Sequence, residues 1–187
     1  MGVEASGLKM TYPEFLELER KSDVRHEYLR GEVFAMAGGT PEHSYLATKM
    51  GTELSIALKG GSCRVFNSDL RVRLVETDYS CYPDVTVVCG ELLRARDDKD
   101  AASNPTLVVE VLSESTEAHD RGAKLAHYRR LPSLKEIVLI SQAPQRVEVW
   151  RRATGHFEVF EWGPGQLIEL ESVNAKIAVD ELYRGMP

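Results

Sequence analysis

The sequence has few cysteines and no long apolar run. Its three cysteines are Cys63, Cys81 and Cys89, and no two have C-x-x-C spacing. An odd, scattered set does not favour a disulfide framework, so we predict buried free thiols. No apolar run approaches the roughly 20 residues that span a bilayer, and residues 1–10 do not resemble a signal peptide. These absences predict a cytoplasmic protein without membrane contact.

Positive charge is also scarce. The chain has 23 Lys and Arg against 29 Asp and Glu, a formal net charge of −6. Proteins that coat nucleic acid through bulk electrostatics are usually basic, so that class is excluded, whereas an enzyme with a local basic surface is not. Any single arginine is more simply explained as a solvated charge. The candidates for a basic surface are Arg64, Arg71, Arg73, Arg129, Arg130, Arg146, Arg151 and Arg152.

Several enzyme motifs are missing. The sequence contains no G-x-S-x-G nucleophile motif, no phosphate-binding loop and no dinucleotide-binding glycine motif. What is present is ordinary for a globular protein, with 43% hydrophobic and 28% charged residues. The length suits a single domain over residues 1–187, with a two-lobed chain as the alternative.

The first third of the sequence predicts a helix, a hairpin and a second helix. Thr11 is placed to cap the first helix, and Thr40 the second, with a proline in each first turn. Arg30-Gly31 marks the turn of a hairpin over residues 26–37.

The rest of the sequence predicts a mixed central sheet flanked by helices, and therefore the α/β class. The apolar runs over residues 82–89 and 106–112 are typical of strands buried on both faces. Residues 94–103 are polar and predict a loop or an exposed short helix. Further strands are predicted over residues 63–66 and 69–75, helices over 119–131 and 179–183, and a C-terminal antiparallel meander over 136–140, 146–151 and 157–161.

Two acids interrupt the buried strands. Asp84 lies in the first apolar run and Glu110 in the second. A carboxylate desolvated without a partner costs several kcal/mol or is neutralised by a shift of its pKa. We therefore predict that both acids share one cation. Oxygen ligands favour Mg²⁺ or Mn²⁺ over zinc. The alternative for each acid alone is an arginine partner or a position in water at a strand end.

A helix after Glu110 carries three polar residues on one face. Asp120, Lys124 and Tyr128 are spaced i, i+4 and i+8. A strand-to-helix connection brings the start of this helix near the end of the Glu110 strand, so Lys124 could give its charge to a reacting phosphate. The alternative is an exposed lysine that pairs with Asp120.

Taken together, these segments resemble the bacterial Uma-type restriction endonuclease family of the PD-(D/E)XK (restriction-endonuclease-like) nuclease superfamily. The resemblance covers nearly the whole chain, and the order and spacing of its parts are more specific than any one of them. The parts are Met10–Phe15, Glu27–Val33, His43, Tyr82–Val85, Leu107–Ser113, and Asp120 through Lys124 to Tyr128.

The resemblance implies a restriction-endonuclease-like fold and assigns further roles. The superfamily places a lysine two residues after the second acid, where this chain has Leu112. Related families carry that lysine on the next helix, where Lys124 stands. An N-terminal acid often joins the metal site, and Glu32 is our candidate. Glu27 competes with it, and strand parity does not decide because a turn intervenes.

The remaining implied roles concern Val111, His43 and Tyr128. The backbone carbonyl of Val111 would join Asp84 and Glu110 as a metal ligand. His43 would orient a water or contact phosphate, with an ordinary surface histidine as the alternative, and Tyr128 would position Lys124 by packing.

The implied function is metal-dependent hydrolysis of DNA phosphodiester bonds. A second interpretation is a nuclease fold that no longer cuts and binds nucleic acid or protein. A third, which nothing favours directly, is a small-molecule hydrolase. The C-terminal meander is apolar enough to form a homodimer interface, or else it closes the core. Its apolar residues are Val147, Val149, Trp150, Phe157, Val159, Phe160 and Trp162.

Overall fold

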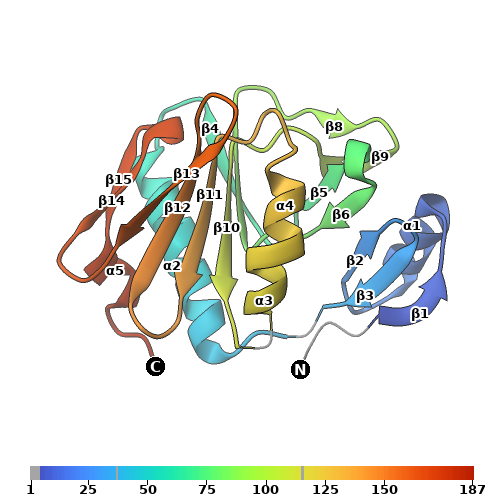
Figure 1. The fold of residues 1–187 in the computed structure, drawn as a ribbon, viewed down its shortest axis with the longest axis horizontal. Coiled ribbons are helices and arrows are strands. Elements are labelled where there is room, and N and C mark those ends of the chain that lie inside the picture. The colour runs from blue at the N-terminus through green and yellow to red at the C-terminus, as the bar shows by residue number, and fades with distance from the viewer. Residues whose placement is uncertain (1–4, 37, 115) are drawn as a thin grey trace.

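The computed structural model describes residues 5–36, 38–114 and 116–187. Within these ranges the chain forms a seven-stranded sheet, a six-stranded sheet and a two-stranded hairpin, with helices against the sheets (Figure 1). Both larger sheets are mixed, because each contains one parallel strand pair. The α/β class is therefore confirmed.

The seven-stranded sheet has the order β1-β3-β2-β6-β5-β9-β8. Its N-terminal strands β1 to β3 and the helix α1 (Tyr12–Lys21) form a lobe at one end of the molecule (Figure 1). The strands are β1 (Ala5–Lys9), β2 (His26–Leu29), β3 (Glu32–Ala35), β5 (Arg71–Leu74), β6 (Tyr79–Cys81), β8 (Arg94–Ala95) and β9 (Asp98–Ala102); a 3-10 turn, η1 (Val75–Thr77), joins β5 to β6.

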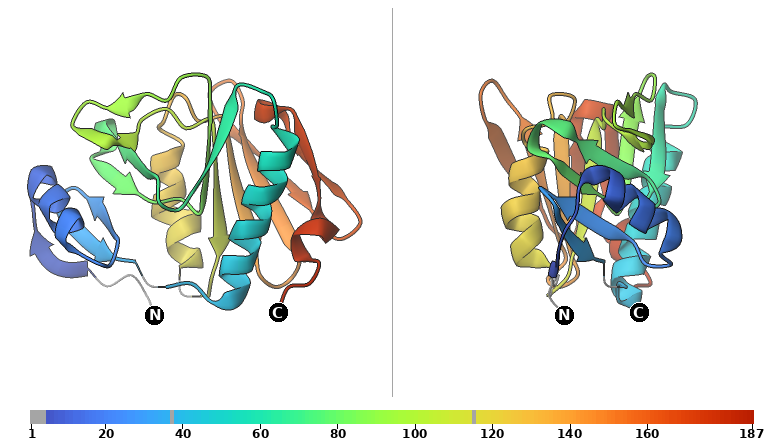
Figure 2. Two further views of the ribbon diagram at one scale, coloured as in Figure 1. Left: turned by 180° about the vertical axis from the view of Figure 1, so that it is seen from behind. Right: turned by 90° about the vertical axis from the view of Figure 1, so that its right-hand side faces the viewer.

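The six-stranded sheet has the order β13-β12-β11-β10-β7-β4. The helix α2 (Pro41–Ala57) and the helical segment at residues 117–128 lie on opposite faces of this sheet (Figure 2). The strands are β4 (Cys63–Asn67), β7 (Val85–Cys89), β10 (Leu107–Leu112), β11 (Glu136–Ser141), β12 (Arg146–Arg152) and β13 (Phe157–Trp162).

The alternation of β10 decides where its acid points. Leu107, Val109 and Val111 belong to the core cluster that contains the buried residues of α2. Val108 and Leu112 belong to the cluster on the other face, with Leu125 and Tyr128. Successive side chains of a strand point to opposite faces, so Glu110 shares the face of Val108 and Leu112. It therefore points towards the helical segment that carries Lys124.

That segment is divided into three parts. It runs as α3 (Glu117–His119), a π-helical turn η2 (Asp120–Lys124) and α4 (Leu125–Tyr128). Wider π turns occur inside α-helices frequently at functional sites. Both ends of η2, Asp120 and Lys124, are buried.

The C-terminal elements complete the core under α2. The hairpin of β14 (Leu167–Leu170) and β15 (Ala175–Ala178) is joined by a 3-10 turn, η3 (Glu171–Val173), and followed by α5 (Val179–Tyr183). Their apolar residues share one cluster with α2. The strands β14 and β15 were not predicted from the sequence.

Local sequence signals explain the elements around the site. The Thr11 backbone N–H donates to the Glu14 carboxylate at 2.7 Å, which completes a capping box. The hairpin turn uses positive φ at Arg30 (49°) and Gly31 (94°), as a two-residue turn requires. Thr40 accepts the backbone N–H of His43 at 3.2 Å and so caps α2.

Two predictions about the middle of the chain were wrong. Residues 94–103 contain β8 and β9 instead of a loop or helix. The acid of β9, Asp98, is buried against Arg71, so the polar pattern did not indicate solvent exposure. Cys63 and Cys89 form a disulfide because the β4–β7 register places them directly opposite each other, whereas Cys81 is a buried free thiol.

Among the described helices, none combines the length and the apolar character needed to cross a membrane.

Candidate functional site

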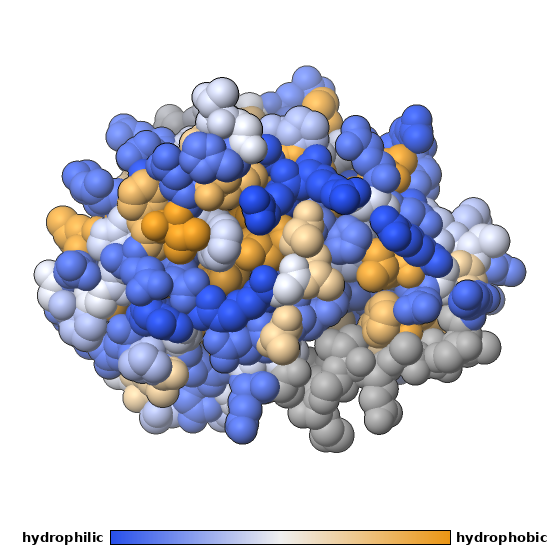
Figure 3. Space-filling model, in the orientation of Figure 1, coloured by the Kyte–Doolittle hydropathy of each residue, from blue (hydrophilic) through white to orange (hydrophobic). Residues whose placement is uncertain are grey.

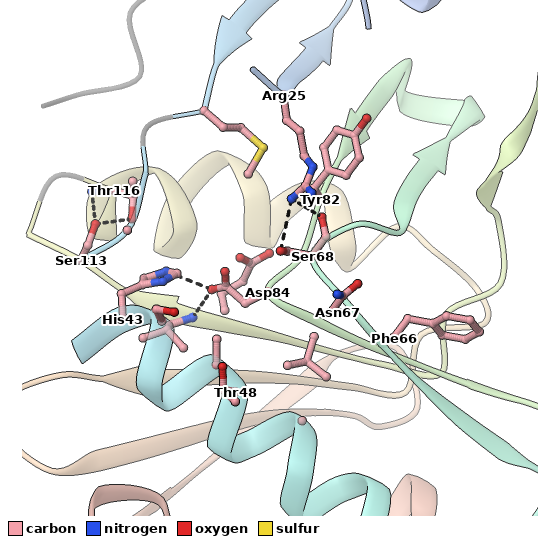
Figure 4. Close-up of a pocket in the computed structure, with 18 of the residues that line it drawn as sticks. Arg25, His43, Thr48, Phe66, Asn67, Ser68, Tyr82, Asp84, Ser113 and Thr116 are labelled. Carbon is pink, nitrogen blue, oxygen red and sulfur yellow. Dashed lines mark hydrogen bonds and ion pairs between the residues drawn. The ribbon is translucent and has the colours of Figure 1, made fainter. Parts of the chain in front are cut away.

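A cavity of about 1380 Å³ lies where the predicted acids gather. Its lining comes from the segment before and within β2, from α2, from β4, from the facing ends of β7 and β10, and from η2. Figure 4 shows Asp84 in its centre, with His43 on one side and Ser68 and Tyr82 on another. The cavity therefore joins parts of the chain that are far apart in sequence.

Asp84 stands just before β7, and not inside the strand as predicted. Its Oδ2 accepts the backbone N–H of Val111 at 2.7 Å. Val85 pairs with Val109 in the antiparallel β7–β10 ladder, so the same register continued by one residue sets Asp84 opposite Glu110. The two acids are neighbours because of this register.

His43 approaches Asp84 from the first turn of α2. Its Nε2 lies 3.2 Å from Asp84 Oδ2. The hydrogen bond to Asp84 raises the pKa of His43 above its usual value, although burial acts in the opposite direction. His43 is therefore a residue of the cavity with a charged partner, and the interpretation as an ordinary surface histidine does not hold.

Glu110 is buried and shares one oxygen between two partners. Tyr128 donates its hydroxyl to Glu110 Oε1 at 2.5 Å, and Lys124 Nζ lies 3.0 Å from the same atom. Burial, together with the negative charges of Asp120 and Asp84, raises the pKa of Glu110 well above its usual value despite Lys124. The carboxylates thus repel one another across the cavity, which an added cation would relieve.

Lys124 lies at the centre of the acidic cluster. Its Nζ is 3.0 Å from Glu110 Oε1, 3.1 Å from Glu27 Oε1 and 3.7 Å from Asp120 Oδ1. Burial lowers the pKa of Lys124, but the three carboxylates outweigh it and hold the pKa well above the usual value. Lys124 is buried and contacts three acids, so the alternative of an exposed lysine paired only with Asp120 is wrong.

Glu27, and not Glu32, is the N-terminal acid in the cavity. Glu27 is buried, accepts the Tyr79 hydroxyl at 2.7 Å and lies 3.5 Å from His119 Nε2. Burial raises its pKa, but Lys124, His119 and Tyr79 together lower it to about 2. Glu32 is exposed on β3 beside the turn and is not among the cavity residues. The assignment of Glu32 is therefore corrected to Glu27.

The donor set fits a hard divalent ion. Within the described part of the chain, no three His, Cys, Asp or Glu side chains are grouped so as to hold a metal by themselves. Mg²⁺ usually takes only one or two protein carboxylates and completes its shell with water and substrate phosphate. Asp84 and Glu110, which lie opposite each other and line the same cavity, supply two carboxylates and so match that requirement.

Four of the eight arginines proposed for a basic surface are paired with carboxylates, and none of the eight lines the cavity. Arg71 contacts Asp98, Arg73 contacts Asp78 and Asp97, and Arg151 contacts Glu136 and Glu171. The cations that line the cavity are Arg25, Lys59 and Lys124 among the residues described. Sequence reasoning missed Arg25 and Lys59, and no spacing pattern marked them.

The fold and the site define a member of a nuclease family. A family model described as "Uma2: Putative restriction endonuclease" matches residues 12–180, and the chain belongs to this family. Two uncharacterized proteins of Synechocystis sp. (strain PCC 6803) are similar to it. One is 36% identical over 95% of this chain and 93% of its own length; the other is 31% identical over 95% and 96%.

A solved structure has the same fold. The crystal structure of a putative nuclease from Anabaena variabilis ATCC 29413 is similar with a TM-score of 0.77 and 21% identity. The match covers 95% of this chain and 99% of that one. At this identity the likeness establishes the fold, which is consistent with the restriction-endonuclease-like superfamily.

Proposed function

We propose that the protein is a metal-dependent endonuclease that hydrolyses DNA phosphodiester bonds. The observation that carries the proposal is the meeting of Asp84, Glu110 and Lys124 in one cavity, with Lys124 Nζ 3.0 Å from Glu110. Family membership supports a nuclease. The metal and the DNA substrate follow from the chemistry of the site and belong to the proposal.

Asp84, Glu110 and the Val111 carbonyl would hold Mg²⁺ or Mn²⁺. Such an ion supplies Lewis acidity that lowers the pKa of a bound water and offsets phosphate charge. Lys124 adds a fixed positive charge beside the reacting phosphate. Tyr128 fixes the Glu110 carboxylate through its hydrogen bond, and Glu27 holds Lys124 from the N-terminal lobe.

His43 is the candidate for proton handling in this site. Its Nε2 lies 3.2 Å from Asp84 Oδ2, and this contact orients the ring within the cavity. A histidine in this position can orient a water or donate to a phosphate oxygen. Asp120 contributes through Lys124, since its Oδ1 lies 3.7 Å from the ammonium.

The test compares two isosteric acid-to-amide variants. We expect wild type to nick or linearise plasmid DNA with Mn²⁺ or Mg²⁺ and to leave it intact in EDTA. Asp84→Asn should slow cleavage by more than about 100-fold, because outer-shell changes alone cost about 10- to 100-fold. Glu32→Gln, which lies outside the cavity, should cleave at the wild-type rate. Gel analysis of supercoiled, nicked and linear DNA gives the rates.

Two outcomes would contradict the proposal. Cleavage by Asp84→Asn at the wild-type rate would remove Asp84 from the reaction. Wild type that binds DNA and cuts with neither ion would favour the second interpretation, a binding module. The buried Leu112 in the position of the superfamily lysine is the observation that favours this alternative.

A further inference from the structure

The cavity has a second part that the acids do not occupy. Its acidic lining residues are Asp23, Glu27, Asp84, Glu110 and Asp120. None of its lining residues between positions 40 and 68 is acidic. This part consists of the outer face of α2 and the edge strand β4. We call it the hydroxyl wall and define it by Thr48, Thr52 and Ser55 of α2, Lys59 of the turn after α2, and Phe66 and Asn67 of β4.

The α2 residues of the wall form one continuous track. Thr48, Thr52 and Ser55 are exposed and separated by four and three positions, and exposed Lys59 follows in the turn after α2. At about 1.5 Å per residue the helical part of the track is roughly 10 Å long. In Figure 4, α2 with Thr48 passes beneath Asp84, and Asn67 and Phe66 on β4 lead away from Asp84. The wall is therefore continuous with the proposed reaction centre.

The size of the cavity favours a polymer over a small molecule. Its volume of about 1380 Å³ exceeds the roughly 300–1,000 Å³ of a typical small-molecule pocket. The opposite side is formed by residues of the N-terminal lobe, namely Asp23, Val24, Arg25, Glu27 and Met36. A polymeric ligand that enters this cavity would pass between the N-terminal lobe and α2.

The charges favour a single strand over a duplex. Duplex DNA carries one negative charge per about 1.7 Å of its axis, and a single strand half that density. Of the three lining cations, Lys124 contacts Glu27 and Glu110, and Arg25 contacts Asp69. Lys59 thus supplies most of the positive charge of this part. So small a charge offsets few of the phosphates of a duplex, and therefore favours the strand of lower charge density, including unpaired stretches of a supercoiled plasmid.

The chemistry of the wall suits unpaired bases. Half-buried Phe66 offers a ring on which a base can stack, and Asn67, whose side chain leaves the opposite face of β4, offers an amide at the strand edge. Thr52 and Ser55 donate their hydroxyls to the carbonyls of Thr48 and Gly51 at 2.8 and 2.7 Å. Their hydroxyl oxygens remain acceptors for base amino groups. Stacking on the Phe66 ring requires a base that has left the stack of a duplex, so this contact favours an unpaired strand.

We infer that the hydroxyl wall binds an unpaired segment of single-stranded DNA and leads it to Asp84 and Glu110. The inference rests on the proposed function and names its substrate class. Contact along the wall comes from stacking and hydrogen bonds to bases, with Lys59 as the phosphate contact.

The test measures binding without cleavage. Wild type in EDTA is titrated into a fluorescein-labelled single-stranded oligonucleotide and into the same strand annealed to its complement, and fluorescence anisotropy gives both Kd values. We expect the single strand to bind at least about tenfold more tightly than the duplex. Phe66→Leu should weaken single-strand binding by about tenfold, within the range expected for loss of one stacking partner.

Two charge-adding variants of α2 form the matched pair. Ser55→Glu places a negative charge on the wall and should weaken single-strand binding by at least about tenfold. Ala57→Glu adds the same charge to the same helix at an exposed position outside the cavity, and should bind like wild type. Circular dichroism melting confirms that both variants are folded.

Different results would contradict the single-strand inference and the proposed nuclease function. Equal or tighter binding of the duplex, or unchanged binding by Ser55→Glu, overturns the inference even if plasmid is cleaved. Preferred binding of the single strand that Ser55→Glu abolishes supports the inference even if no metal activates cleavage.

Discussion

Lys124 shows how a single residue makes an acidic cavity stable. A buried charge without partners is costly, and removal of one partner from a buried pair costs several kcal/mol. Lys124 contacts Glu110, Glu27 and Asp120, so its one charge serves three carboxylates. A divalent ion and Lys124 would therefore both offset the negative charge of these three carboxylates.

Asp98 makes the free energy of unfolding depend on pH. Its Oδ2 accepts from Arg71 at 2.7 Å and from Tyr12 at 2.8 Å. Burial acts to raise the pKa of Asp98, but Arg71 outweighs it and the folded pKa lies below the usual value. The stabilisation is then complete above the unfolded pKa of about 3.9 and declines as the pH falls towards the folded pKa.

We expect Asp98→Asn to lower the free energy of unfolding by about 2 kcal/mol at neutral pH. The difference from wild type should narrow as the pH falls below about 4, where the unfolded chain binds a proton at this position before the folded protein does. Urea unfolding followed by circular dichroism at several pH values measures it. Asp100→Asn, at an exposed position of the same strand, should change stability by less than about 0.5 kcal/mol. A difference that stays constant over this pH range would contradict the assignment.

The sequence predicted some residues of the site and not others. Asp84 and Glu110 were found because an acid inside an apolar run is unusual, and Lys124 because of its helical spacing. Glu27 could not be chosen over Glu32, because the fold of the hairpin decides which acid is buried. Arg25 and Lys59 reach the cavity only through tertiary packing, which leaves no local pattern.

At the scale of elements, a buried acid fixes the C-terminal hairpin. Glu136 on β11 is fully buried and accepts from Arg151 at 2.8 Å, from the Ser172 hydroxyl at 2.5 Å and from the backbone N–H of Glu171 and Ser172 at 3.2 and 3.0 Å. The last two groups belong to η3, which joins β14 to β15. Glu136 therefore ties the hairpin to the six-stranded sheet.

We expect Glu136→Ala to cost roughly 3 kcal/mol, because Arg151 and two backbone donors lose their acceptor. Urea unfolding gives the cost, and faster amide exchange in β14 and β15 would show that the hairpin is released. Glu171 also pairs with Arg151, but its side chain is 65% exposed. Glu171→Ala should therefore cost less than about 1 kcal/mol of the free energy of unfolding. Equal costs for the two variants would show that Glu136 has no special role.

Some helices, turns and strands could be predicted from the sequence and others could not. Helix caps and the Arg30-Gly31 turn are local, so they could be read directly. The strands β8, β9, β14 and β15 are short and carry charges such as Asp98 and Glu169, which find partners only in the folded protein. The Cys63–Cys89 bond depended in the same way on the register of β4 against β7.

At the scale of the whole molecule, β13 is an edge strand that exposes apolar surface. Val147 and Val149 of the meander are buried in the core, whereas Val159 on β13 is 44% exposed. Figure 3 shows hydrophobic patches over this side of the molecule, separated by hydrophilic ones. Exposed edge strands pair readily with another chain. We propose that two copies of the chain associate through β13.

Sedimentation tests this proposal. We expect wild type to form a dimer that dissociates on dilution, and Val159→Lys to be monomeric, because a charge on an edge strand opposes pairing. Leu167→Lys, at an exposed apolar position of β14, should leave the dimer intact. A wild type that sediments as a monomer at about 50 µM would refute the dimer, since that concentration reveals even weak association.

Glu27 belongs to one large sheet and Glu110 to the other, and Lys124 joins them. During synthesis the N-terminal strand leaves the ribosome long before the helix that bears the lysine. A growing chain thus holds the acids but lacks the ammonium that unites them. If the protein cuts DNA, the site is complete only when both large sheets have folded and Lys124 lies between Glu27 and Glu110.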